Sequence, residues 1–72
     1  MTRTVLKVAD SGRRFIVTFT TGTNRNPYRI IELYRDGEKQ RRRTVEKYQC
    51  LNSCLYWLCN VQEFNRDCFK VV

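Results

Sequence analysis

The sequence predicts an α+β fold: a four-stranded antiparallel meander packed on one helix, in the order ββββα. Two patterns carry this prediction. Three turn-forming segments join four short candidate strands in the first 45 residues, and residues 14–20 alternate with a period of two, which is typical of an antiparallel meander. From Tyr48 onward apolar residues recur at i, i+3, i+4 and i+7, the spacing of one helix face. The length of 72 residues indicates a single domain, residues 1–72.

The first two predicted strands form a hairpin. In the first, Val5, Lys7 and Ala9 alternate with Leu6 and Val8. Residues 14–20 have a clearer period of two, with β-branched and aromatic side chains that favour strands. The intervening Asp-Ser-Gly of residues 10–12 is a turn-forming segment.

Two further strands follow a loop. Residues 21–27 hold Gly22, Pro27 and two asparagines, a composition typical of turns. Residues 28–35 predict the third strand. The Asp-Gly pair at 36 and 37 is a strong hairpin signal, because both types tolerate positive φ, and residues 38–45 predict the fourth strand.

The helix is predicted from an apolar stripe formed by Tyr48, Leu51, Cys54, Leu55, Leu58 and Val61. We expect it to begin between residues 44 and 52, with Thr44, Asn52 and Ser53 as alternative caps. Asn65 is expected to end it in the left-handed conformation. Residues 68–72 either add a short edge strand or pack against the sheet.

The predicted core combines the apolar face of the first hairpin with the helix stripe. The sequence leaves open which face of the third strand is buried, because Ile30 and Ile31 point to opposite sides of a strand. The expected core residues are Leu6, Val8, Phe15, Val17, Phe19, Leu51, Cys54, Leu55, Leu58 and Val61.

Positive charge is concentrated in the first two thirds of the chain. The formal net charge is +7, and twelve of the fourteen Lys and Arg residues lie in the first 47 positions. Such a surface favours an anionic partner, either nucleic acid or an acidic protein surface. The alternative is that the charge only maintains solubility.

The leading functional hypothesis is a small basic module that binds nucleic acid through its sheet and loops with little sequence specificity. On a strand, Arg41 and Arg43 share one face and Arg42 lies on the other. The alternative for this run is an edge strand protected from aggregation by charge. The expected phosphate contacts are Arg14, Arg25, Arg29, Arg41, Arg42, Arg43 and Lys47.

Two neighbouring segments add to this hypothesis. The loop of residues 21–26 offers hydroxyls, amides and a guanidinium, all of which contact phosphate oxygens. Tyrosine and arginine alternate on the third strand, at Tyr28, Arg29, Tyr34 and Arg35, a composition suited to base stacking and backbone contact. The alternative is that the tyrosines pack with their hydroxyls at the rim of the core.

The rival hypothesis is a protein-interaction module, such as an inhibitor or regulator of a nucleic-acid-handling protein. Tyr56 is expected to project from the helix and Trp57 to lie on the flank of its stripe. Together they form a candidate patch for a protein partner or for a homodimer. The ordinary alternative is an exposed tyrosine beside a tryptophan that closes the core.

Catalysis, metal binding and cofactor binding are not expected. The chain has no histidine, which is the usual general base near neutral pH, and no Gly-rich phosphate loop. Cys50 and Cys54 could share a metal ion at i, i+4 of the predicted helix, but Cys59 points away from Cys54 and no histidine completes a zinc site. We expect Cys50, Cys54, Cys59 and Cys68 to be reduced.

An intracellular, cytoplasmic protein without a membrane partner is expected. No apolar run of signal-peptide length follows Met1, and the apolar stretch of residues 54–59 is too short to span a bilayer.

Overall fold

The computed structural model describes residues 1–22 and 25–72. It confirms the predicted α+β class: one antiparallel sheet in the order β4-β3-β2-β1-β5, with one helix between β4 and β5. Residues 68–72 supply the short edge strand. The strands are β1 (Thr2–Ala9), β2 (Arg14–Thr20), β3 (Tyr28–Asp36), β4 (Lys39–Tyr48) and β5 (Phe69–Val71).

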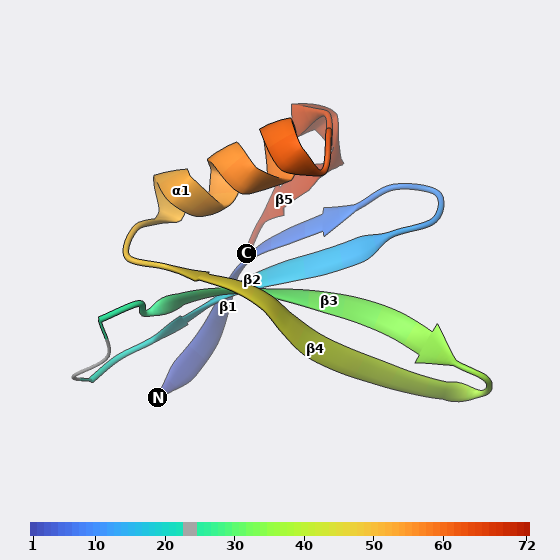
Figure 1. Cartoon of the computed structure of the whole chain (residues 1–72), viewed down its shortest axis with the longest axis horizontal. Helices are drawn as coiled ribbons and strands as arrows, with labels where there is room; N and C mark the ends of the chain where they lie inside the picture. Colours follow the sequence, from blue (N-terminus) through green and yellow to red (C-terminus); the bar gives the residue numbers. More distant parts are fainter. Residues whose placement is uncertain (23–24) are drawn as a thin grey trace.

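The sheet is twisted, and its two hairpins diverge. Figure 1 shows the β1–β2 and β3–β4 hairpins separating toward their turns, with the helix near the point where the strands cross. The tip of the β3–β4 hairpin extends away from the helix, so the helix covers only part of one face. Gly37, at φ 65°, allows the tight turn between β3 and β4.

Strand register decides which side chains face the helix. Val17 pairs with both Leu6 of β1 and Ile30 of β3, and paired residues in antiparallel strands share a face. Ile30 is therefore in the core, fully buried, which resolves the ambiguity of the third strand. The register shifts between Thr4 and Leu6 on β1, and on β4 opposite Ile30 and Ile31. These bulges keep the core-facing residues of both strands on the helix side.

The core agrees with most of the predicted set. Phe19, Leu51 and Leu55 are partly exposed rather than buried, and Val61 is 58% exposed. Phe64, which lay outside the predicted core, is buried against Phe15 with ring centroids 5.5 Å apart. The buried cluster is Leu6, Val8, Phe15, Val17, Ile30, Cys54, Leu58 and Phe64.

The helix begins within the predicted interval but without a predicted cap. It comprises α1 (Leu51–Tyr56) and continues directly into a π-helical segment, η1 (Trp57–Val61). The residue at the cap position is Cys50, in an extended conformation with no side-chain capping hydrogen bond. Thr44 lies within β4 and Asn52 within α1, so the caps predicted at Thr44, Asn52 and Ser53 are wrong.

The π-helical segment explains the exposure of Val61. The Gln62 N–H bonds Trp57 O at 3.1 Å, an i→i+5 hydrogen bond that adds a residue to the turn. A regular wheel of 3.6 residues per turn no longer applies, so Val61 leaves the inward stripe. The chain then reverses at Glu63 (φ 58°), which directs Phe64 into the core.

Asn65 has a different role from the predicted one. Its φ of −76° is not left-handed, and its side chain accepts a hydrogen bond from the Asp67 N–H. Asn65 therefore caps the short 3₁₀ segment η2 (Arg66–Cys68), which leads into β5. The left-handed residue after the helix is Glu63 instead.

Arg13 connects the first hairpin to the end of the helix. Its guanidinium donates to Asp10 Oδ2 at 2.7 Å and to the Gln62 carbonyl at 2.8 Å, and it lies 4.2 Å from the centroid of the Phe64 ring. Asp10 also accepts from the Gly12 N–H at 3.0 Å. We call this set of contacts among Asp10, Arg13 and Gln62 the clasp. It joins the first hairpin to Gln62, which lies 49 positions after Arg13 in the chain.

The clasp predicts a pH-dependent contribution to stability. Hydrogen bonds from the Gly12 N–H and the Arg13 side chain lower the pKa of Asp10 from its ordinary 3.8. A depressed folded-state pKa stabilises the fold above the unfolded value, and this contribution disappears as the pH falls through the folded value. Asp10→Asn should therefore be less stable than the parent protein at pH 7, and the difference should shrink toward pH 2.

Urea unfolding between pH 2 and pH 7 measures this difference. Asp67→Asn is the matched control, because Asp67 makes no ion pair with the residues the structure describes. The control should change stability at pH 7 less than Asp10→Asn does. A difference between Asp10→Asn and the parent that stayed constant with pH would contradict the role given to the clasp.

Candidate functional site

The face of the sheet opposite the helix carries most of the basic residues of the strands and none of their carboxylates. Starting from the inward Val17, the pairing register places every second residue of each strand on this open face. Seven basic residues from all five strands lie there. These open-face cations are Lys7, Arg14, Arg29, Arg35, Arg42, Lys47 and Lys70.

The acidic residues of the strands all lie on the other face. Glu32 pairs with Phe15 and Arg43, and Glu46 pairs with Ile30, so both point to the helix side. Asp36 follows Glu32 by four strand positions and shares its face. The strands thus separate their charges: cations without carboxylates on the open face, and mixed charges on the helix side.

The ion pairs follow the same division. Arg43 contacts Glu32 at 2.6 Å and Arg41 contacts Asp36 at 3.1 Å, both on the helix side. The remaining ion pair joins Arg13 to Asp10 in the first turn. Within residues 1–22 and 25–72, none of the seven open-face cations has a carboxylate partner.

Some open-face cations are placed directly against each other. Lys7 pairs with Lys70 across β1 and β5, and Arg29 pairs with Lys47 across β3 and β4. Like charges directly opposite on neighbouring strands are destabilising. An anion bound on this face would relieve the repulsion.

Two buried polar atoms on the open face also lack a partner. Thr18, 5% exposed, lies directly opposite Arg29. Thr18 Oγ1 and Arg29 Nε are buried without a hydrogen bond in the part of the chain that the structure describes. Leaving a buried donor unsatisfied costs about 1–3 kcal/mol. A phosphate oxygen reached by a small movement of Arg29 would supply the missing acceptor.

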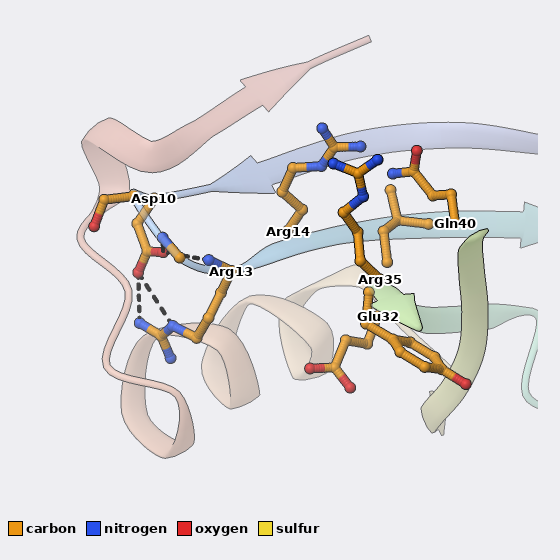
Figure 2. Close-up of a pocket in the computed structure, with 10 residues that line it drawn as sticks. Asp10, Arg13, Arg14, Glu32, Arg35 and Gln40 are labelled. Carbon is orange, nitrogen blue, oxygen red and sulfur yellow. Dashed lines mark hydrogen bonds and ion pairs between the residues drawn. The ribbon is translucent and has the colours of Figure 1, made fainter. Parts of the chain in front are cut away.

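The open face ends in a hollow between the two hairpins. Arg14, Arg35 and Gln40 line this hollow of about 540 Å³ together with the turn that holds Arg13. Figure 2 shows the guanidiniums of Arg14 and Arg35 extending to the same side next to the Gln40 amide, whereas Glu32 points the opposite way. The corner thus presents two positive groups and an amide to the same space.

The structure divides the predicted phosphate contacts between different surfaces. Arg14, Arg29, Arg42 and Lys47 come together on the open face, and Arg41 and Arg43 lie on the helix side in ion pairs. The predicted alternation of residues 41–43 is confirmed. Arg25 is exposed in the loop before β3, and Thr23 and Asn24 of that loop lie outside the described residues.

The tyrosines and arginines of β3 do not form one surface. Tyr28 and Tyr34 face the helix side, with Tyr28 packed 5.0 Å from the Phe19 ring, whereas Arg29 and Arg35 face the open side. The tyrosines and arginines of β3 are therefore available to different surfaces of the sheet. The alternative, tyrosines packed at the margin of the core, describes Tyr28.

Three open-face cations lay outside the predicted set: Lys7, Arg35 and Lys70. Alternation along β3 places Arg35 with Arg29, so this residue was open to prediction from sequence. Lys7 and Lys70 join the face through the pairing of β1 with β5, which are more than 60 positions apart in the chain. No pattern within a short stretch of the sequence predicts that pairing.

The second predicted patch is divided in a similar way. Tyr56 is 67% exposed, as expected, and lines a hollow of about 490 Å³ with Leu55, Asn60 and Phe69. Trp57 is partly buried, with its ring 5.9 Å from that of Phe15. Tyr56 is available to a partner, whereas Trp57 chiefly closes the core.

The cysteines at the start of the helix have opposite surroundings. Cys50 is exposed, and its Sγ lies 3.3 Å from Ser53 Oγ. Hydrogen bonds from the Ser53 side chain and then from the Ser53 N–H lower the pKa of this thiol. Cys54 is fully buried, as predicted for a small apolar residue, and burial raises its pKa to about 11.

This contrast predicts an order of thiol reactivity, because the thiolate is the reactive form. Iodoacetamide at pH 7.5 should modify Cys50 first and Cys54 only on unfolding, as measured by tandem mass spectrometry. Ser53→Ala should slow the modification of Cys50, because it removes the hydrogen bond that lowers the pKa. Modification of Cys54 before Cys50 in the folded protein would contradict the prediction.

Comparison of this chain with protein-family models, with curated proteins and with solved structures found no significant match. Across residues 1–22 and 25–72, the structure has no helix with the length and apolar character needed to cross a bilayer.

Proposed function

We propose that this protein is a small binding module, without catalytic activity, that binds nucleic acid through the open face of its sheet. The observation that carries the proposal is the separation of charge: seven cations lie on that face, and every strand carboxylate lies on the other. Phosphate groups supply the closely spaced negative charges that such a face lacks. A cytoplasmic location is part of this proposal.

The shape of the molecule supports contact through the sheet rather than through the helix. A helix that reads base edges requires basic or amide side chains on its outer face. The helix from Leu51 to Val61 carries the amides Asn52 and Asn60 but no basic residue that would hold it on the phosphates. Binding through phosphates alone is consistent with low sequence specificity, because phosphate contacts carry no base information.

A salt titration tests the proposal. Binding of a fluorescein-labelled 24-base-pair duplex is measured by anisotropy between 25 and 300 mM KCl. At about 0.9 per neutralised phosphate, the slope of log K against log salt should approach about −6 when all seven open-face cations contact phosphates. The absence of binding to duplex and single-stranded oligonucleotides at 25 mM KCl would refute the proposal.

Tyr56 supports a second proposal, that the chain binds a protein. An exposed tyrosine beside a hollow lined by Leu55 and Phe69 has the composition of an interaction hot spot. The partner would be an acidic protein surface, for example on a nucleic-acid-handling protein, or a second copy of this chain. Pull-down of one stoichiometric protein that survives nuclease treatment and is lost in Tyr56→Ala would favour this function over nucleic-acid binding.

A further inference from the structure

The open face has cations but no aromatic rings. The aromatic residues of the strands all pair with helix-side residues, and the remaining rings lie in the helix or just after it. No ring lies among the described residues of the open face. The helix-side strand aromatics are Phe15, Phe19, Tyr28, Tyr34, Tyr48 and Phe69.

This absence bears on the form of the nucleic acid. Proteins that bind single strands combine a basic groove with aromatic platforms, and each stacked base contributes about 1–3 kcal/mol. The open face offers exposed bases no such platform. In a duplex the bases already stack on one another and the phosphates face outward, so a face that only contacts phosphates loses nothing by the lack of rings.

Six of the seven open-face cations also lie in two banks. Lys7 and Lys70 form one bank on β1 and β5, and the other bank, on β3 and β4, is formed by Arg29, Arg35, Arg42 and Lys47. Arg14 and Ile16 lie between them on β2.

The separation of the banks fits the two backbones of a duplex. From β1 to β4 there are three strand spacings, or about 14 Å at 4.7–4.9 Å each. The two phosphate lines that border the major groove of B-form DNA are separated by a groove about 12 Å wide. One bank can therefore contact each backbone, while Ile16 and Arg14 on β2 lie between them.

We propose that the open face selects double-stranded over single-stranded nucleic acid by placing one bank of cations against each backbone. This inference rests on the proposed function and names the form of its ligand. Phosphate lines on both sides of a groove are common to DNA and RNA duplexes, so separate arms of the test distinguish the two. A DNA preference would follow if the major-groove spacing is read, because A-form RNA has a narrow major groove.

Competition binding tests the inference. The labelled 24-base-pair DNA duplex is displaced at 50 mM KCl by unlabelled duplex DNA, duplex RNA, either single strand or inorganic polyphosphate, matched in phosphate concentration. We expect one of the duplexes to compete at least tenfold better than the single strands and polyphosphate. Equal or better competition by single strands or polyphosphate would overturn the inference and leave nucleic-acid binding standing. Failure of the labelled duplex to bind at all would instead remove the proposed function.

A double variant tests the two-bank geometry. Lys7→Gln with Lys70→Gln neutralises one bank, and because these lysines oppose each other, the change should not destabilise the fold. Duplex affinity should fall about tenfold, with the salt slope reduced by about two, and single-strand affinity should fall less. An equal loss for duplex and single strand would show that the banks add charge without recognising two backbones.

Discussion

Neutralising three open-face cations should weaken duplex binding about 10- to 150-fold, whereas neutralising three cations elsewhere should change it little. The open-face variant combines Arg14→Gln, Arg42→Gln and Lys47→Gln. At about 0.5–1 kcal/mol for each exposed phosphate contact, the three changes remove about 1.5–3 kcal/mol of binding free energy. The salt slope should also fall by about three. Anisotropy titration at 100 mM KCl measures both quantities.

The control variant combines Arg41→Gln, Arg43→Gln and Arg66→Gln. Each triple variant lowers the formal net charge from +7 to +4, so the two proteins differ only in where the charge is lost. Arg41 and Arg43 belong to the same arginine run as Arg42 but lie on the helix side in ion pairs. Equal loss of affinity in both variants would mean that net charge, and not the open face, determines binding.

Leu58→Ala should remove a large share of the free energy of unfolding. Leu58 is fully buried at the centre of the core, and truncating such a residue costs about 2–5 kcal/mol. A domain of 72 residues has a total stability of about 4–11 kcal/mol, at 0.05–0.15 kcal/mol per residue. Urea unfolding followed by circular dichroism should show a large fall in the midpoint, or no folded baseline.

Val61→Ala is the matched control, because the amphipathic pattern places Val61 on the same stripe as Leu58. In the structure Val61 is 58% exposed at the end of the π-helical segment. Its truncation should cost less than about 0.5 kcal/mol, as for most surface substitutions. A loss comparable to that of Leu58→Ala would mean that the helix keeps a regular α-helical register to residue 61.

The sequence alone was sufficient for features encoded by neighbouring residues. The alternation around Phe15 and Val17 predicted β2, and the Asp36-Gly37 pair predicted the turn of the second hairpin, because each depends on local backbone preference. The opposite orientations of Arg41 and Arg42 also followed from alternation. The same rule places Tyr28 and Arg29 on opposite faces of β3.

The tertiary structure decided how these local patterns combine. The π-helical turn exposes Val61, and the reversal at Glu63 buries Phe64. The end of the helix packs against the sheet and does not keep the 3.6-residue period of a regular α-helix. Alternation defines two faces within each strand, but only the pairing register shows which faces coincide across the sheet. Irregularities in β1 and β4 and the pairing of Lys7 with Lys70 across the chain determine that register. Local sequence therefore determined the strands, the helix and the two faces of each strand. Long-range pairing determined that seven cations lie on the same face of the sheet, because strand register depends on contacts between distant residues.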